Sequence, residues 1–189
     1  MKNLKILIII GLVFLTINQL LILNGDEFIQ KQQPIDFVHW LLLIGAVLSL
    51  SVNNVFSNSG IGKIASFLTF AGVVALIGQA TIDLVWWSFG TDYEGLIKLI
   101  NQLESKPSIW ITFMAVGPSF FYIGLAIHAV KFLKTNTFAS IVVILSTIII
   151  GLASLVWTER LVIVFGHIFL TIGIILLLYR KENVTQQRV

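Results

Sequence analysis

The sequence predicts an all-α integral membrane protein: a single bundle of six transmembrane helices, with a short amphipathic helix outside. Of the 189 residues, 57% are hydrophobic and only 11% are charged, and the mean hydropathy is +0.97. A soluble domain of this size carries about a quarter charged residues. The apolar runs are continuous and do not alternate, which favours helices over a β-barrel. These observations indicate that the chain folds in a bilayer, as one domain over residues 1–189.

Six runs are long enough to cross a bilayer core about 30 Å thick, which takes roughly 20 helical residues. The first begins after Lys2 and Lys5, as a secretory signal does, but it is too long and lacks a small-residue cleavage site. Gly117-Pro118 predicts a kink in the fourth. Small and polar residues at helical spacing, such as Ser119 and Tyr122, indicate helix packing. The predicted spans are 4–23, 35–52, 64–89, 108–130, 137–157 and 161–179.

The segment 90–107 joins the third and fourth spans and predicts a short amphipathic helix. Within residues 94–106, Leu96, Ile97, Leu99, Ile100 and Leu103 share one face, and charged side chains occupy the other. Such a helix lies flat in the headgroup region or caps the bundle.

The distribution of charge predicts the orientation. Eight of the 12 Lys and Arg residues fall on the side that both termini share, whereas eight of the nine acids fall on the opposite side. The positive-inside rule therefore places both termini, including a tail at 180–189, in the cytoplasm. We expect a cell membrane, either a bacterial inner membrane or a plasma membrane. The pI near 9.3 reflects this topology and predicts no nucleic-acid partner.

Polar residues distant in sequence fall at one depth near the outer ends of the spans. Ionisable groups within a span usually face the bundle and have a partner. The tryptophans concentrate at the same level and would form pocket walls: Trp40, Trp86, Trp87 and Trp157. The predicted polar cluster is Asp36, His39, Gln79, Asp83, Glu159, Arg160 and His167.

Four interpretations of this cluster remain open from the sequence. The first is a hydrogen-bonded network, with Arg160 paired to Glu159. The second is an outward-facing pocket that binds, senses or moves a small or amphiphilic molecule. A third interpretation is a metal-dependent hydrolase or transferase acting on a lipid. His39, Asp83 and His167 would then hold zinc, and Glu159 would act as base. The fourth is b-type haem ligated by His39 and His167.

The sequence predicts no resident cofactor. Cysteine is absent, which excludes disulfides and thiolate metal sites, and no nucleotide-binding loop is present. The interpretation therefore leans away from an enzyme. The expected partners are the lipid bilayer and a small amphiphilic ligand, and the sequence does not predict an oligomeric state.

Overall fold

The computed structural model describes residues 2–32, 34–56 and 60–179, and the predicted tail at 180–189 lies outside this range. The fold is all-helical, with 84% helix and no strand in the described part of the chain. The elements in chain order are α1 (Lys2–Ile22), α2 (Asp26–Gln30), α3 (Phe37–Ser49), α4 (Ser51–Phe56), α5 (Gly60–Ser88), α6 (Tyr93–Glu104), α7 (Pro107–Ile109), η1 (Trp110–Ala115), α8 (Ser119–Val130), α9 (Thr137–Leu152), η2 (Ala153–Trp157) and α10 (Arg160–Leu178).

Five helical stretches of the described residues are long and apolar enough to cross a membrane: Lys2–Ile22, Phe37–Phe56, Gly60–Ser88, Thr137–Trp157 and Arg160–Leu178. A sixth stretch consists of Pro107–Ala115 and Ser119–Val130, which meet at an angle of 45°. The bend confirms the kink predicted at Gly117-Pro118, where proline cannot donate to the preceding turn.

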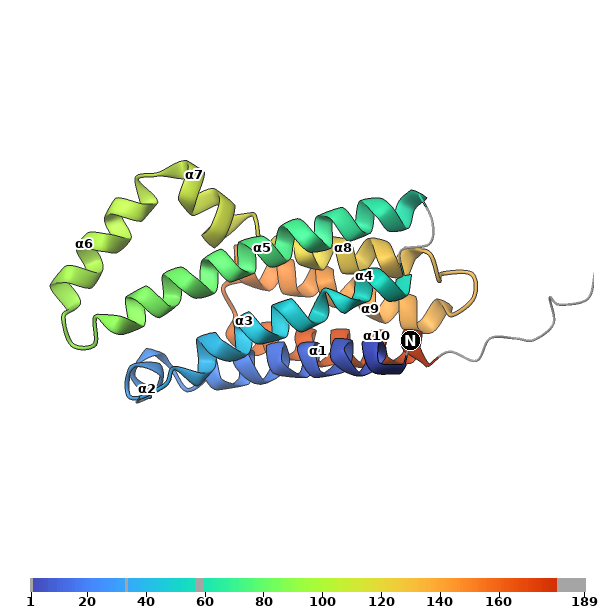
Figure 1. The fold of residues 1–189 in the computed structure, drawn as a ribbon, viewed down its shortest axis with the longest axis horizontal. Coiled ribbons are helices and arrows are strands. Elements are labelled where there is room, and N and C mark those ends of the chain that lie inside the picture. Colours follow the sequence, from blue (N-terminus) through green and yellow to red (C-terminus); the bar gives the residue numbers. More distant parts are fainter. Residues whose placement is uncertain (1, 33, 57–59, 180–189) are drawn as a thin grey trace, which may run out of the picture.

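The long helices pack in chain order into a closed ring. Helix α1 packs on α3, α3 on α5, α5 on α8, α8 on α9, and α9 on α10, which returns to α1. The start of α1 and the end of α10 lie at one end of the ring, and α2, α6 and α7 lie at the other (Figure 1). Every long helix therefore contributes one face to a common interior.

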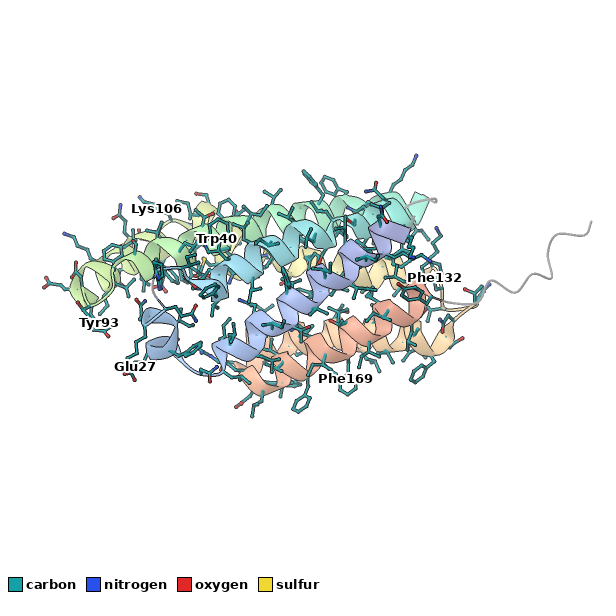
Figure 2. The ribbon with its side chains drawn as sticks, turned by 60° about the horizontal axis from the view of Figure 1, so that its bottom comes forward. Glu27, Trp40, Tyr93, Lys106, Phe132 and Phe169 are labelled. Atoms are coloured by element: carbon teal, nitrogen blue, oxygen red, sulfur yellow. The ribbon has the colours of Figure 1, made fainter. Side chains whose placement is uncertain are left out.

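The outward face of this ring is apolar. Large side chains point away from the bundle on α5, α9 and α10, including Phe67 (70% exposed) and Phe138 (71% exposed). Phe169 stands out from α10 in the same way (Figure 2). Soluble proteins do not expose apolar surface on this scale. This apolar surface suits a hydrocarbon environment, as does the presence of helices long and apolar enough to cross a membrane.

Close backbone contacts hold neighbouring helices together. Gly11 of α1 faces Gly45 and Ser49 of α3, and a Cβ atom on Gly11 would lie 2.8 Å from the Gly45 carbonyl oxygen. A Cβ atom on Gly72 of α5 would lie 2.0 Å from the backbone nitrogen of Phe121 in α8. Glycine is required at both positions because any side chain would separate the helices.

Three local features differ from the sequence prediction. The five-residue helix α2 was not expected, the second span is divided at Leu50, and two stretches are π-helical, η1 and η2. The apolar pattern does not reveal these features because hydropathy reports burial in lipid and not the spacing of backbone hydrogen bonds. The amphipathic helix predicted at 94–106 is present as α6, and its first turn is capped by Asp92.

Candidate functional site

A cavity of about 310 Å³ lies inside the ring, between its middle and the end that carries α2 and α6. Its lining includes residues from α1, α3, α5, α8, α9 and α10, so it is enclosed by all the long helices. We call it the central cavity. Among the described residues, its lining includes one carboxylate, that of Asp83, and no lysine or arginine. The polar side chains that line it are Asn18, Gln19, His39, Gln79, Asp83, Ser119, Tyr122, Ser154 and His167.

His39 lies between two carboxylates. Asp36 is buried and caps α3, because its Oδ1 accepts a hydrogen bond from the backbone nitrogen of His39 at 3.1 Å. Its Oδ2 accepts from Nδ1 of the same histidine. A carboxylate only accepts, so Nδ1 carries a hydrogen, and Nε2 is the ring nitrogen on the side of Asp83. Asp83 Oδ2 lies 3.8 Å from that Nε2, which is too far for a hydrogen bond.

His167 belongs to a second, separate network. Its Nδ1 donates to the Ile163 carbonyl at 2.9 Å, so its Nε2 accepts the hydrogen of the Tyr122 hydroxyl, also at 2.9 Å. The two rings meet edge to face, with centroids 5.6 Å apart. Among the described residues, no carboxylate forms an ion pair with His167. The two histidines therefore line one cavity from different helices with different partners.

Two polar residues of α1 also line the central cavity, and the sequence analysis did not assign them to the site. Asn18 is fully buried and donates from Nδ2 to the Val38 carbonyl at 2.9 Å. Gln19 donates to the Asn18 side-chain oxygen at 2.9 Å. Their position in the sequence could have identified them. Two adjacent amide side chains within an apolar span need hydrogen-bond partners inside the protein.

A second cavity, of about 410 Å³, lies between the central cavity and α6. We call it the outer cavity. It shares Ile22, His39 and Asp83 with the central cavity, and its walls include Trp86 and Trp87. Leu96 and Ile100 of α6 cover one side of it. Trp87 donates from Nε1 to the Ile29 carbonyl at 3.1 Å, which ties α2 to the end of α5.

The remaining residues of the predicted cluster, Arg160 and Glu159, lie outside the central cavity. Arg160 lines the outer cavity, but it pairs with Asp26 at 3.6 Å and not with Glu159 as expected, and it donates to the Ile22 carbonyl at 3.1 Å. Glu159 is exposed at the start of α10 and lines neither cavity. Trp40 and Trp157 are also exposed and line neither cavity.

The positions of the His, Asp and Glu side chains do not favour the metal or the haem interpretation. Among the described residues, no three His, Asp or Glu side chains come together as a metal site would require. His39 is near Asp83, whereas His167 bonds to Tyr122 and Ile163. Both ring nitrogens of His39 face carboxylates, so ligation of a haem iron would have to displace one of them.

We expect Tyr122→Phe to lower the free energy of unfolding by about 1–3 kcal/mol, because it leaves the buried Nε2 of His167 without its donor. Chemical unfolding of the purified protein in mixed micelles measures the change. Tyr93→Phe is the matched control, since Tyr93 is exposed and should tolerate loss of its hydroxyl. Equal stability of both variants would contradict the proposed Tyr122–His167 bond.

The fold and the cavities define a class: an all-helical protein with helices long and apolar enough to cross a membrane, arranged around a polar interior. No family model, curated protein or solved structure matches the chain.

Proposed function

We propose that this chain crosses a cell membrane six times, with both termini in the cytoplasm, and binds a small or amphiphilic molecule in the central cavity. The bent stretch from Pro107 to Val130 serves as the fourth span. The apolar outward face of the ring supports the membrane assignment, because hydrocarbon is the solvent such a surface matches.

The separation of charge supports the orientation. At the end of the ring that carries the start of α1, the described charged residues are five lysines: Lys2, Lys5, Lys63, Lys131 and Lys134. All eight described acidic residues belong to the opposite end, together with α2 and α6 (Figure 2 labels Glu27 there). The positive-inside rule then assigns the lysine-rich end to the cytoplasm.

The convergence of polar side chains from every long helix on one cavity carries the binding proposal. A ligand site is typically a concave space with a few polar groups that orient the ligand. Packing alone does not need nine polar side chains around a space of this size. The carboxylate of Asp83 and the absence of lysine and arginine in the lining favour ligands without negative charge.

The outer cavity supplies a route to this site from the acid-rich side. Gln30 and Trp86 both line it, and neither Gln30 Oε1 nor Trp86 Nε1 has a hydrogen-bond partner among the described residues. Buried polar atoms normally have partners.

The absence of cysteine allows a direct test in proteoliposomes or spheroplasts. We expect Gln79→Cys, which is one turn from Asp83, to react from outside with charged, membrane-impermeant methanethiosulfonates. A cationic reagent should react about tenfold faster than an anionic one, because a carboxylate in a low-dielectric cleft concentrates cations. The reaction rate is measured from the fraction of protein modified at successive times.

Two exposed control positions calibrate the labelling. Gln102→Cys in α6 should react from outside with either reagent, and Lys134→Cys should react only after the membrane is permeabilised. Adding Asp83→Asn to Gln79→Cys should remove the preference for the cationic reagent. An unreactive Gln79→Cys, or one that reacts equally with both reagents, would refute the proposed site. Outside reactivity of Lys134→Cys would refute the orientation.

A further inference from the structure

An apolar groove of about 340 Å³ runs along the outward side of α8 and α9. Its walls are aliphatic, with Ile123, Ile127 and Val130 on α8 and Ile144 and Ile148 on α9. Ile123 is 44% exposed and Ile148 is 51% exposed, so the groove is open on the face that the membrane covers. We call it the lateral groove.

The lateral groove adjoins the central cavity. Four residues line both spaces: Ser119, Tyr122, Gly151 and Leu155. Gly151 lies at this junction, and a Cβ atom added there would have no atom within 4 Å apart from its chain neighbours and the adjacent backbone of its own helix. At Gly151, therefore, no side chain of α9 fills the space beside the residues that the two spaces share.

The length of the lateral groove matches one leaflet. From Ser119 to Val130 the α8 backbone rises about 16 Å at 1.5 Å per residue. Half of a hydrocarbon core about 30 Å thick is about 15 Å. The polar cavity lies toward the acid-rich end and the groove continues toward the lysine-rich end. A lipid with its headgroup in the cavity and its chain in the groove would point the same way as an outer-leaflet lipid, with the chain in the half of the bundle nearest the lysine-rich end.

We propose that the ligand is a lipid amphiphile that enters sideways between α8 and α9, with its hydrocarbon chain in the lateral groove and its headgroup in the central cavity. This inference rests on the proposed function. The headgroup carries hydroxyl or amine donors and no phosphate. Asp83 and the hydroxyl and amide side chains of the cavity accept hydrogen bonds from such donors, whereas the lining offers no lysine or arginine to neutralise an anion.

Photo-crosslinking of the full chain in nanodiscs tests this proposal. The probe is a 16-carbon monoacylglycerol with a diazirine in the middle of its chain, and the comparator carries a phosphate on the same chain. We expect the adducts of the first probe to map to the peptides of α8 and α9 that line the lateral groove. An excess of unlabelled monoacylglycerol should compete for these adducts, and the phosphate form should not.

Closing the junction should prevent this binding. Gly151→Leu places a side chain in the open space beside the cavity. We expect it to reduce the yield of groove adducts about tenfold, which is the loss of affinity expected if two methylene groups of the lipid chain no longer fit in the groove. Leu152→Phe is the matched control on the exposed face of α9 and should leave the yield unchanged. Ala126→Leu narrows the groove from α8 and should have the same effect as Gly151→Leu, so the test does not depend on one variant folding.

The outcomes separate this inference from the proposed function. Scattered adducts, or adducts that Gly151→Leu and Ala126→Leu leave unchanged, would overturn lateral entry by a lipid. If Gln79→Cys still shows its cationic preference, the central cavity would remain a site for a water-soluble ligand. Stronger labelling by the phosphate probe would overturn the proposed headgroup chemistry.

Discussion

Gly72→Ala is expected to lower the free energy of unfolding by about 3 kcal/mol or more, at the upper end of the cost of overpacking. The added methyl group would lie 2.0 Å from the Phe121 backbone nitrogen and 2.5 Å from its Cα atom. Neither atom belongs to a flexible side chain, so α5 and α8 must move apart. Unfolding in mixed micelles and the yield of monodisperse protein measure the effect.

Gly151→Ala is the control for this prediction, because it makes the same chemical change in open space. Alanine favours helix over glycine by up to about 1 kcal/mol, so this variant should be as stable as the parent or more stable. If Gly72→Ala and Gly151→Ala have the same stability, the close packing of α5 on α8 is wrong.

Asp36→Ala is expected to have the second large effect, a loss of about 3 kcal/mol. Its carboxylate caps α3 through the His39 backbone nitrogen, and caps contribute about 1 kcal/mol. It also accepts from His39 Nδ1, a charge-assisted hydrogen bond that contributes about 2 kcal/mol. Because Asp36 is buried, solvent does not replace these partners. The unfolding free energy in mixed micelles reports the change.

Asp92→Ala separates the two contributions. Asp92 caps α6 through the Gly95 backbone nitrogen at 3.0 Å, with the same geometry, but it is exposed and holds no histidine. We expect it to cost about 1 kcal/mol. The difference between the two variants therefore measures the contact between Asp36 and His39. Equal losses would show that this contact contributes nothing.

Asp36 also fixes the orientation of the His39 ring. By holding Nδ1, Asp36 leaves Nε2 of His39 turned toward Asp83 and the central cavity. Loss of Asp36 should therefore free the ring to rotate as well as destabilise α3. In the Gln79→Cys labelling experiment, such rotation would change the reaction rate even in the fraction of protein that remains folded.

The long apolar stretches were predictable because each one depends only on local composition. The fifth span, 137–157, matches the structure at both ends, and the others agree within a few residues. The bend at Gly117-Pro118 was equally local, since proline removes a backbone donor wherever it occurs in a helix. The division of the second span at Leu50 and the π-helical stretches were not predictable, because they depend on how the helices pack.

The site was only partly predictable, because the sequence indicates the depth of a side chain in its helix but not its contacts. The positions of His39, Gln79, Asp83 and His167 along their helices indicated a shared depth, and all four line the central cavity. Depth alone does not tell which residues touch. Sequence reasoning assigned Tyr122 to packing, yet it bonds to His167, and it paired Arg160 with Glu159, yet Arg160 meets Asp26.

The sequence by itself determined that the chain is helical, that hydrocarbon suits its surface, and that eight of the nine acids fall at the end opposite eight of the 12 lysines and arginines. Only the tertiary structure decided the closed ring of helices, the two separate histidine networks and the open space beside Gly151. The physical reason is that helical periodicity sets the depth and the face of each side chain. The rotation of each helix and the choice of its neighbours depend on close packing between segments distant in the chain.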